Sequence, residues 1–320
     1  MIPLDSICQA KLRLKGLVHR TPMWHSAFLS ERLGVPVDLK LELFQKTGSF
    51  KPRGAFNKIL SLTEEERKRG IVAVSGGNHA QGAAYAARHL GIQATVVMPA
   101  GTAAYSIDAT RGYGAKVVLA PTIAQAFADV ERLRAEGLVL VHPFDDPLVA
   151  AGQGTIGLEI LEDVPDVTHV YVSIGGGGLI TGIASALKAI RPEIHVIGVE
   201  TEGADVMSRS LRENRLVEIP ITSIARTLGA PKASELTLNA VRKLVEEVVV
   251  VSDASAVEAL VLIMERLKYA VEPAAACCLV AAERQKTRFK QGDHIVILLC
   301  GGNLALSELC EWHQRFLVNK

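Results

Sequence analysis

The sequence has no excess of charge of either sign. Lys and Arg total 35 and Asp and Glu total 34, which gives a formal net charge of +1 over 320 residues. Binding to nucleic acid or to an anionic membrane surface relies on a marked positive charge. The balance therefore gives no electrostatic reason to expect either partner.

Cysteine is sparse and falls into no metal-binding pattern. The five cysteines are Cys8, Cys277, Cys278, Cys300 and Cys310. They form no CxxC pair and no Cys/His array with zinc spacing. Reduced thiols are the simplest account of such an odd set, and they favour a cytoplasmic protein.

Long hydrophobic runs are missing as well. The apolar run at residues 274–282 falls far short of the roughly 20 residues that span a bilayer. Residues 1–17 carry charge throughout and contain no continuous apolar segment of the kind found in secretory signals. We expect no membrane association and no export.

Aromatic residues make up only 5% of the chain, although 49% of it is hydrophobic. A hydrophobic fraction made mainly of Ala, Val, Leu and Ile suits helices packed on a buried parallel sheet. At 320 residues the chain is long enough for one large domain or two closely packed ones.

Short β-branched runs alternate with longer helical stretches from about residue 70 onward. The first series is strand 71–74, helix 80–90, strand 94–98, helix 104–113, strand 116–119, helix 122–136 and strand 138–141. The second is helix 148–161, strand 169–174, helix 179–190, strand 195–199, helix 204–213, loop 214–235, strand 247–251, helices 254–267 and 273–282, strand 294–299 and a helix from 304. This order predicts an α/β fold with two doubly wound parallel-sheet lobes. We expect a small domain at 46–149, inserted in a larger one formed by 1–45 and 150–320.

Four consecutive glycines, Gly175 to Gly178, follow the predicted strand 169–174 and precede Leu179 at the start of a helix. Such a turn exposes backbone N–H groups next to a positive helix end, which suits a phosphate. The turn matches neither the dinucleotide fingerprint nor the P-loop, so a smaller phosphate ester is favoured. Tight packing of strand against helix is the alternative, but it accounts for one or two glycines rather than four.

Lys51 stands in the segment Ser49-Phe50-Lys51-Pro52-Arg53. Pro52 biases Lys51 toward extended geometry and can itself begin a helix, so the lysine projects from a helix entrance. Taken alone, a surface lysine would be the better interpretation. With a phosphate site elsewhere in the chain, we interpret Lys51 as an activated amine that forms a Schiff base.

Two further turns follow predicted strands. Ser75, Gly76, Gly77, Asn78 and His79 open the helix after strand 71–74, and their donors could receive a carboxylate and a ring hydroxyl. A helix cap by Ser75 or Asn78 is the alternative, and the two are compatible.

Cys300, with Gly301, Gly302 and Asn303, follows strand 294–299 and by itself is interpreted as a small buried thiol. Glu272, before Pro273, is interpreted as a charge at a helix N-terminus.

The motifs SFKPRGA, SGGNHAQG, GGGGL and CGGN, in this order and spacing, resemble those of fold type II pyridoxal-phosphate enzymes. Within that fold they are similar to the serine/threonine dehydratase and serine racemase family, from about Thr21 to Asn303. The resemblance implies pyridoxal 5'-phosphate held by Lys51 as a Schiff base, with Phe50 beside the ring and Asn78 on the ring hydroxyl. It further implies that the phosphate lies on Gly175, Gly176, Gly177, Gly178 and Leu179, and that Cys300 faces the ring nitrogen.

The thiol of Cys300 bears on the type of reaction. A neutral thiol, with a reference pKa of about 8.5, cannot act as a counter-anion to a protonated ring nitrogen. Loss of a β-substituent is then favoured over transamination. The resemblance implies α,β-elimination from L-threonine or L-serine, with Lys51 removing the Cα proton and a 2-oxo acid and ammonia released.

Several alternatives stay open. Racemases of this group carry a serine where this chain has Gly76, so we expect little racemisation. A dehydratase for another 3-hydroxy amino acid, such as 3-hydroxyaspartate, is possible because a methyl group is discriminated by only about 1–3 kcal/mol. A β-replacement enzyme and a cofactor-binding protein with little catalysis are further alternatives.

The family also often binds a cation near the phosphate turn. The matching positions here are the Glu200 side chain and the carbonyls of Gly175, Ala204, Leu228 and Ala230. The divalent pattern has an aspartate where this chain has Val206, so we expect potassium instead, while an exposed strand end is the alternative for Glu200. The family is commonly dimeric, and we expect a homodimer.

Overall fold

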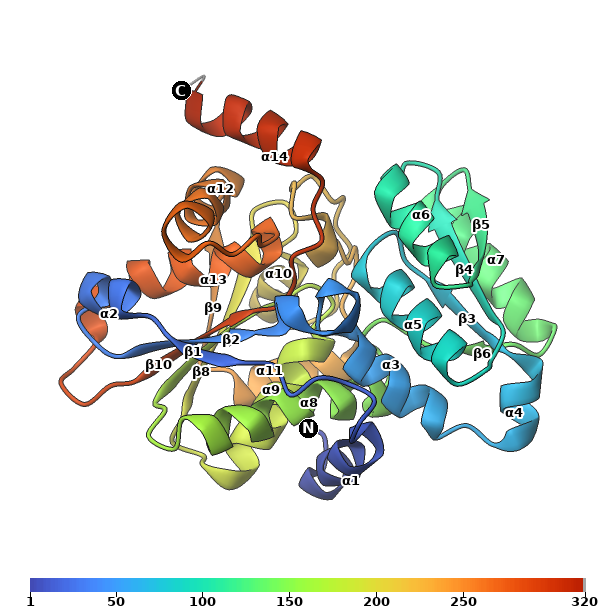
Figure 1. Cartoon of the computed structure of the whole chain (residues 1–320), viewed down its shortest axis with the longest axis horizontal. Helices are drawn as coiled ribbons and strands as arrows, with labels where there is room; N and C mark the ends of the chain where they lie inside the picture. The colour runs from blue at the N-terminus through green and yellow to red at the C-terminus, as the bar shows by residue number, and fades with distance from the viewer. Residues whose placement is uncertain (319–320) are drawn as a thin grey trace.

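The computed structural model describes residues 1–318 (Figure 1). Ten strands form two sheets, and fourteen α-helices surround them. The large sheet has the strand order β1-β2-β10-β7-β8-β9. Its strands are β1 Met23–His25, β2 Val37–Leu41, β7 His169–Ser173, β8 His195–Thr201, β9 Glu247–Val251 and β10 Ile295–Leu299. All neighbours are parallel except β1 and β2.

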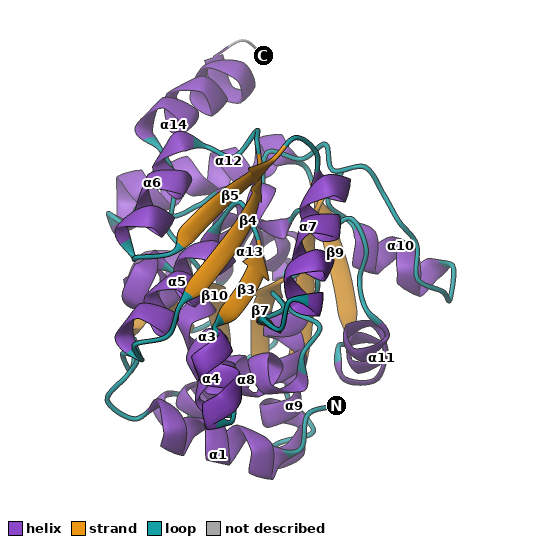
Figure 2. Ribbon diagram, turned by 90° about the vertical axis from the view of Figure 1, so that its right-hand side faces the viewer, coloured by secondary structure: helices purple, strands orange, loops and turns teal. Residues whose placement is uncertain are grey.

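The small sheet has the order β5-β4-β3-β6 and is entirely parallel. Its strands are β3 Ile71–Val74, β4 Ala94–Pro99, β5 Lys116–Ala120 and β6 Val139–Leu140. Figure 2 looks onto this sheet, with helices α5 (Asn78–His89) and α6 (Ala104–Gly112) on one side and α7 (Ile123–Ala135) on the other. The small sheet is therefore covered by helices on both faces.

Helices also cover both faces of the large sheet. α12 (Asp253–Leu262) and α13 (Pro273–Arg284) lie on one face, and α8 (Pro147–Asp163), α9 (Gly178–Ile190) and α11 (Glu235–Leu244) lie on the other (Figure 1). Strands β2 and β10 are completely buried, as expected for a sheet sandwiched between helices.

Six further helices complete the described structure. They are α1 Leu4–Leu14, α2 Ala27–Leu33, α3 Lys51–Leu60, α4 Glu64–Arg69, α10 Val206–Arg212 and α14 Leu306–His313. α3 links the two sheets, and α14 projects from the body at the C-terminal end (Figure 1). In the described part of the chain, residues 1–318, the helices are all too short or too polar to cross a bilayer.

The predicted α/β fold with two parallel-sheet lobes is confirmed. Strand β6 is shorter than the predicted 138–141, and the predicted helix 254–267 ends as an α-helix at Leu262 and continues as a π-helical turn. Helices α4 and α11, and the strands and helices before residue 42, go beyond those expected. The domain boundaries at 46–149, 1–45 and 150–320 stay a prediction.

The chain direction of the strands positions the site. β7 ends at Ser173 and β10 ends at Leu299, and both pair in parallel near the middle of the large sheet. Their carboxyl ends therefore point to the same edge, where the glycine turn and Cys300 begin. β3 ends at Val74, next to the Ser75–His79 loop.

Candidate active site

One cavity of about 740 Å³ collects the motifs that the sequence analysis singled out. All the residues expected to bind cofactor or substrate line it, namely Phe50, Lys51, Ser75, Gly76, Gly77, Asn78, His79, Gly175, Gly176, Gly177, Gly178, Leu179 and Cys300. They come from both sheets and from α3. The volume suits a small cofactor together with a small substrate.

Lys51 is the first residue of α3, and Pro52 stands in the first turn of that helix. The Nζ atom donates a hydrogen bond to the carbonyl oxygen of Pro143 at 3.0 Å and lies 5.0 Å from the centre of the Phe50 ring. Burial lowers the pKa of Lys51 to about 8, although Cys300 and Glu272 act in the opposite direction. Much of the amine is thus neutral at mildly alkaline pH, as a nucleophile or base requires.

The glycine turn leads from β7 into α9. Gly177 has a φ of 93°, a backbone conformation that favours glycine. A Cβ at Gly176 would lie 2.1 Å from the Phe144 ring, and one at Gly178 would lie 2.8 Å from the Phe144 Cα. Tight packing therefore accounts for more than the one or two glycines that the sequence analysis assigned to it.

The same turn also fits an anion. The N-terminus of α9 has no side-chain cap, so its first N–H groups have no capping acceptor. Because the turn lines the cavity, these donors and the helix dipole are available to a phosphate. The residues present therefore fit the phosphate group of pyridoxal phosphate.

Asn78 begins α5, and its side-chain amide is held at both ends. Its Nδ2 donates to the Glu272 carboxylate at 2.9 and 3.1 Å, and its Oδ1 accepts from Asn303 Nδ2 at 2.8 Å. Asn303 Nδ2 also donates to the Thr47 carbonyl at 2.7 Å.

The rest of the loop is supported by its neighbours. Ser75 Oγ accepts from the Gly77 N–H at 3.1 Å, and Ser106 Oγ donates to the Gly76 carbonyl at 2.9 Å. His79 Nε2 lies 2.7 Å from the Val141 carbonyl, and burial lowers the pKa of His79 to about 3. A neutral, hydrogen-bonded imidazole supports the loop and is not suited to act as the base.

Cys300 follows β10 and is buried. Its Sγ accepts from Ser173 Oγ at 3.4 Å and lies 4.0 Å from Glu272 Oε1. Burial, with the nearby Glu272, raises the pKa of the thiol well above its ordinary value. The thiol is therefore protonated and neutral throughout the physiological range.

Glu272 is a cavity residue that sequence reasoning missed. It precedes α13 as expected, but its side chain makes no capping bond to that helix and instead meets Asn78 in the cavity. Burial raises its pKa to about 7. The position before Pro273 was correctly interpreted, but side-chain direction at a helix start depends on tertiary contacts.

Three of the five residues expected to hold a cation, Gly175, Leu228 and Ala230, line the cavity. A Cβ built on Gly175 would lie 3.1 Å from the Leu228 carbonyl oxygen. Glu200 and Ala204 are buried outside the cavity. The Glu200 carboxylate accepts from the N–H groups of Met207 and Ser208 and from the Ser208 hydroxyl.

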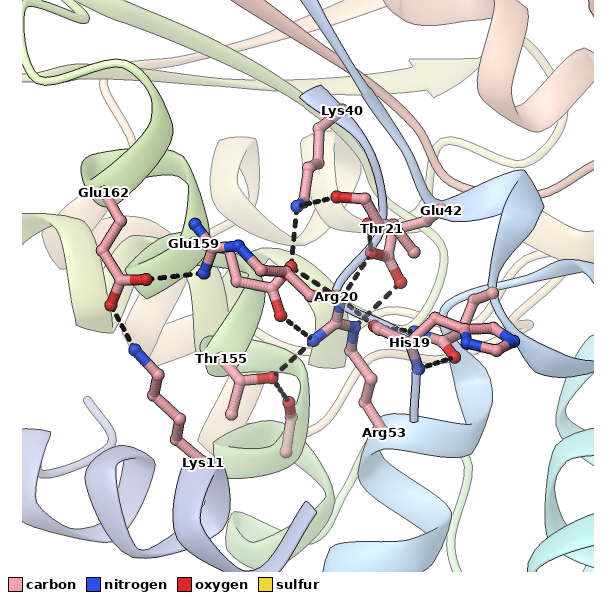
Figure 3. Close-up of polar contacts among 12 residues, drawn as sticks. Lys11, His19, Arg20, Thr21, Lys40, Glu42, Arg53, Thr155, Glu159 and Glu162 are labelled. Atoms are coloured by element: carbon pink, nitrogen blue, oxygen red, sulfur yellow. Dashed lines mark hydrogen bonds and ion pairs between the residues drawn. The ribbon is translucent and has the colours of Figure 1, made fainter. Parts of the chain in front are cut away.

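A buried ion cluster surrounds the guanidinium of Arg53 (Figure 3). Arg53 follows Lys51 by two residues. Its guanidinium donates to the Glu42 carboxylate and to the Glu159 carboxylate, at 2.7 to 2.9 Å. Lys40 also contacts Glu159, at 2.7 Å. The cluster connects α3 to β2 and α8, so it joins the helix that carries Lys51 to the large sheet.

Comparison with known proteins agrees with this geometry. Residues 14–301 match the model of the family described as "Pyridoxal-phosphate dependent enzyme". The L-threonine ammonia-lyase of Thermotoga maritima is 47% identical over 95% of this chain and 76% of its own length. The catabolic L-threonine dehydratase TdcB of Escherichia coli K12 is 41% identical over 97% and 95%.

Solved structures show the same relationship. Maize serine racemase superposes with a TM-score of 0.92 at 37% identity, covering 99% of this chain and 98% of its own. The processed form of threonine deaminase isoform 2 from Solanum lycopersicum superposes with a TM-score of 0.89 at 33% identity, covering 97% and 93%. With a family match over most of its length and relatives above 40% identity, this chain belongs to the pyridoxal-phosphate-dependent enzymes.

Proposed function

We propose that this chain is an ammonia-lyase that eliminates water from L-threonine, L-serine or both and yields a 2-oxo acid and ammonia. The observation that carries the proposal is the meeting of the Lys51 amine, the glycine turn and the Asn78 loop in one cavity. Relatives named threonine ammonia-lyase and threonine dehydratase support this choice of substrate.

Pyridoxal phosphate, when bound, supplies an electron sink for the bond broken at the substrate Cα. The chain's residues supply the rest. The glycine turn and the N-terminus of α9 would hold the phosphate, Phe50 would lie beside the ring, and Asn78 would bind the ring hydroxyl. The N–H groups of the Ser75–His79 loop, at the uncapped start of α5, bind the substrate carboxylate.

Lys51 Nζ moves the proton. Burial lowers the pKa of this amine to about 8, so a large part of it is neutral and able to accept a proton at mildly alkaline pH. It takes the Cα proton as general base, and the Pro143 carbonyl, 3.0 Å away, helps to orient it.

Cys300 directs the outcome. Its protonated thiol gives no counter-charge to a ring nitrogen, so the site favours loss of the β-hydroxyl over amino-group transfer. Ser173, 3.4 Å away, fixes the sulfur with its hydroxyl.

We also propose a potassium ion near Glu200, coordinated by this carboxylate and by the carbonyls of Gly175, Ala204, Leu228 and Ala230. Burial raises the pKa of Glu200 to about 7, because a buried carboxylate is costly in its charged form. A bound cation would offset the cost of burying that charge. Equal activity in potassium, sodium and choline buffers would contradict this proposal. A cytoplasmic homodimer is the assembly that we propose, and sedimentation of the purified protein tests its size.

The test of the function is oxo-acid formation across a panel of L-threonine, L-serine, 3-hydroxyaspartate and other 3-hydroxy amino acids. We expect turnover of threonine or serine, and none by Lys51→Ala. Turnover of 3-hydroxyaspartate alone would replace the substrate assignment. Product formation that requires added sulfide would point to β-replacement.

Serine racemisation is the second candidate, because maize serine racemase is a close structural neighbour. The Gly76 position argues against it. A Cβ at Gly76 would lie 2.6 Å from Thr102 Oγ1, so this site has no room for a larger residue without a shift. We expect D-serine formation to be minor beside pyruvate formation, and comparable rates would overturn that.

A further inference from the structure

Glu272 occupies the N-cap position of α13, but its side chain lines the cavity and does not cap the helix. Only 3% of its surface is exposed, and its carboxylate makes no bond to the N–H groups of α13. A buried carboxylate without compensating contacts costs several kcal/mol. Its partners include Asn78, Thr227 and Cys300, so its contacts converge on the cavity wall.

The contact with Asn78 fixes the direction of an amide. An ionised carboxylate can only accept, so it selects the Nδ2 end of Asn78. At the other end, Asn303 presents an N–H to Asn78 Oδ1 while it also donates to the Thr47 carbonyl. The amide of Asn78 therefore has one orientation in which both ends are satisfied.

Gly301 leaves the space in which Glu272 and Asn78 meet. A Cβ on Gly301 would lie 2.7 Å from Glu272 Oε1 and 3.1 Å from Asn78 Nδ2. The contact is thus built by three segments that are distant in sequence.

We propose that Glu272 is a positioning residue that acts through Asn78. It holds the Asn78 amide so that Nδ2, and not Oδ1, lies at the cavity, where this nitrogen would donate to the ring oxygen of the cofactor. The inference rests on the proposed function, since it concerns how the cofactor is seated. A rotated amide would present its carbonyl oxygen instead, which repels the ring oxygen when that oxygen is deprotonated.

The positioning requires an acceptor oxygen at residue 272, and the charge of Glu272 affects only how strictly the orientation of Asn78 is selected. The titratable groups that act on Glu272 are Lys51 on α3, Cys300 after β10, Cys277 within α13 and Tyr105 on α6, and Thr227 donates a hydrogen bond. Because burial raises its pKa to about 7, the carboxylate is ionised only above that pH. Below it, a protonated carboxyl offers a donor as well, and the orientation of Asn78 is less strictly selected.

The experiment compares Glu272→Leu with Glu272→Gln in the purified full chain. Leu keeps the approximate size and removes the acceptor, while Gln keeps an acceptor oxygen and removes the charge. Two quantities are measured with pyridoxal phosphate as the probe: its dissociation constant, and the pH midpoint of the visible absorbance of the bound cofactor. Glu272→Leu should weaken binding by about 10- to 100-fold, as for a buried hydrogen bond left unmade, and shift the midpoint. Glu272→Gln should stay within about threefold of the wild type in affinity.

A double-mutant cycle shows whether the effect passes through Asn78. In the Asn78→Ala background, Glu272→Leu should change neither quantity further. An undiminished effect in that background, an effect of Gln equal to that of Leu, or a Leu variant equal to the wild type would each overturn the inference.

A separate variant covers the case in which Glu272→Leu does not fold. Gly301→Ala leaves both partners in place and displaces their contact, so it should reproduce the shift of the midpoint. An unchanged midpoint in this variant would also count against the inference. Failure of the wild type itself to bind pyridoxal phosphate would instead refute the proposed function.

Discussion

Lys51 and Glu272 share the cavity, and burial acts on them in opposite directions. It lowers the pKa of the amine to about 8 and raises the pKa of the carboxyl to about 7, because in each case it disfavours the charged form. Each charge partly offsets the cost of the other. The two groups therefore titrate within the range in which enzymes usually work.

The pH dependence of cofactor uptake follows from the pKa of Lys51. Only the neutral amine attacks an aldehyde, and its fraction rises as the pH rises through the pKa of the folded state. We expect the rate at which apo-protein takes up pyridoxal phosphate to rise up to about pH 8 and then level off. Stopped-flow absorbance measures this rate.

Two controls accompany that measurement. Nα-acetyl-lysine should show a rise that continues to about pH 10, the ordinary range of a lysine. The Glu272→Gln variant removes the nearby carboxyl, so a rise in rate that persists in this variant belongs to Lys51 and not to Glu272. A protein profile that continues to rise like that of the free amine would contradict the lowered pKa.

At the scale of elements, α8 and α9 are packed unusually closely. A Cβ on Gly182 of α9 would lie 2.1 Å from the Ala150 carbonyl and 2.6 Å from the Gly154 nitrogen of α8. These neighbours are backbone atoms and cannot rotate away. Because α9 begins at the glycine turn, its distance from α8 also sets the position of that turn.

Gly182→Ala should therefore lower the free energy of unfolding by at least about 2 kcal/mol, through overpacking. Gly112→Ala is the matched control. Nothing lies within 4 Å of a Cβ added there, and alanine suits a helix better than glycine, so stability should stay equal or rise by up to about 1 kcal/mol. Urea unfolding of both variants tests this, and a Gly182→Ala protein as stable as the wild type would show that the helices can separate.

The sequence predicted those elements whose pattern is local. The turn at Gly175–Gly178 and the Asn78 loop each follow a buried strand, and the structure places both at strand ends in the cavity. Helix α11 lies beyond the expected elements, because it directly follows an irregular stretch with few clear boundaries. Its residues Leu238, Val241 and Leu244 are buried by contacts with other elements.

The position of Glu272 could not be predicted for a related reason. Whether a glutamate before Pro273 caps its own helix or turns to Asn78, 194 residues earlier, depends on how the two sheets face each other. In the same way, close contacts account for each of the four glycines in part, which no spacing in the sequence reveals. The predicted cation ligands stay a prediction.

At the scale of the whole molecule, the buried ion cluster connects α3 to the large sheet. Arg53, Lys40 and Glu42 are completely buried, and two positive side chains there face two carboxylates. Burial alone would lower the pKa of Arg53, but Glu42 and Glu159 raise it above its ordinary value overall. The guanidinium stays charged, and removal of any one member leaves the buried charges unbalanced.

Arg53→Met should lower the free energy of unfolding by about 3–5 kcal/mol, because Glu42 and Glu159 lose their main partner. Lys68→Met is the control, since Lys68 pairs with Glu64 in an exposed i,i+4 pair worth about 0.5 kcal/mol or less. Thermal and urea unfolding measure both. Equal stability of the two variants would show that the cluster does not hold α3 in place.

The central claim is that the amine of Lys51 holds the cofactor, with the cofactor's phosphate on the glycine turn. Borohydride reduction of the loaded protein, followed by peptide mass spectrometry, tests it most directly. We predict one pyridoxyl-phosphate adduct, on the peptide that contains Lys51, and none in Lys51→Ala. An adduct on a different lysine, or an unmodified Lys51 in protein that has bound the cofactor, would contradict the account.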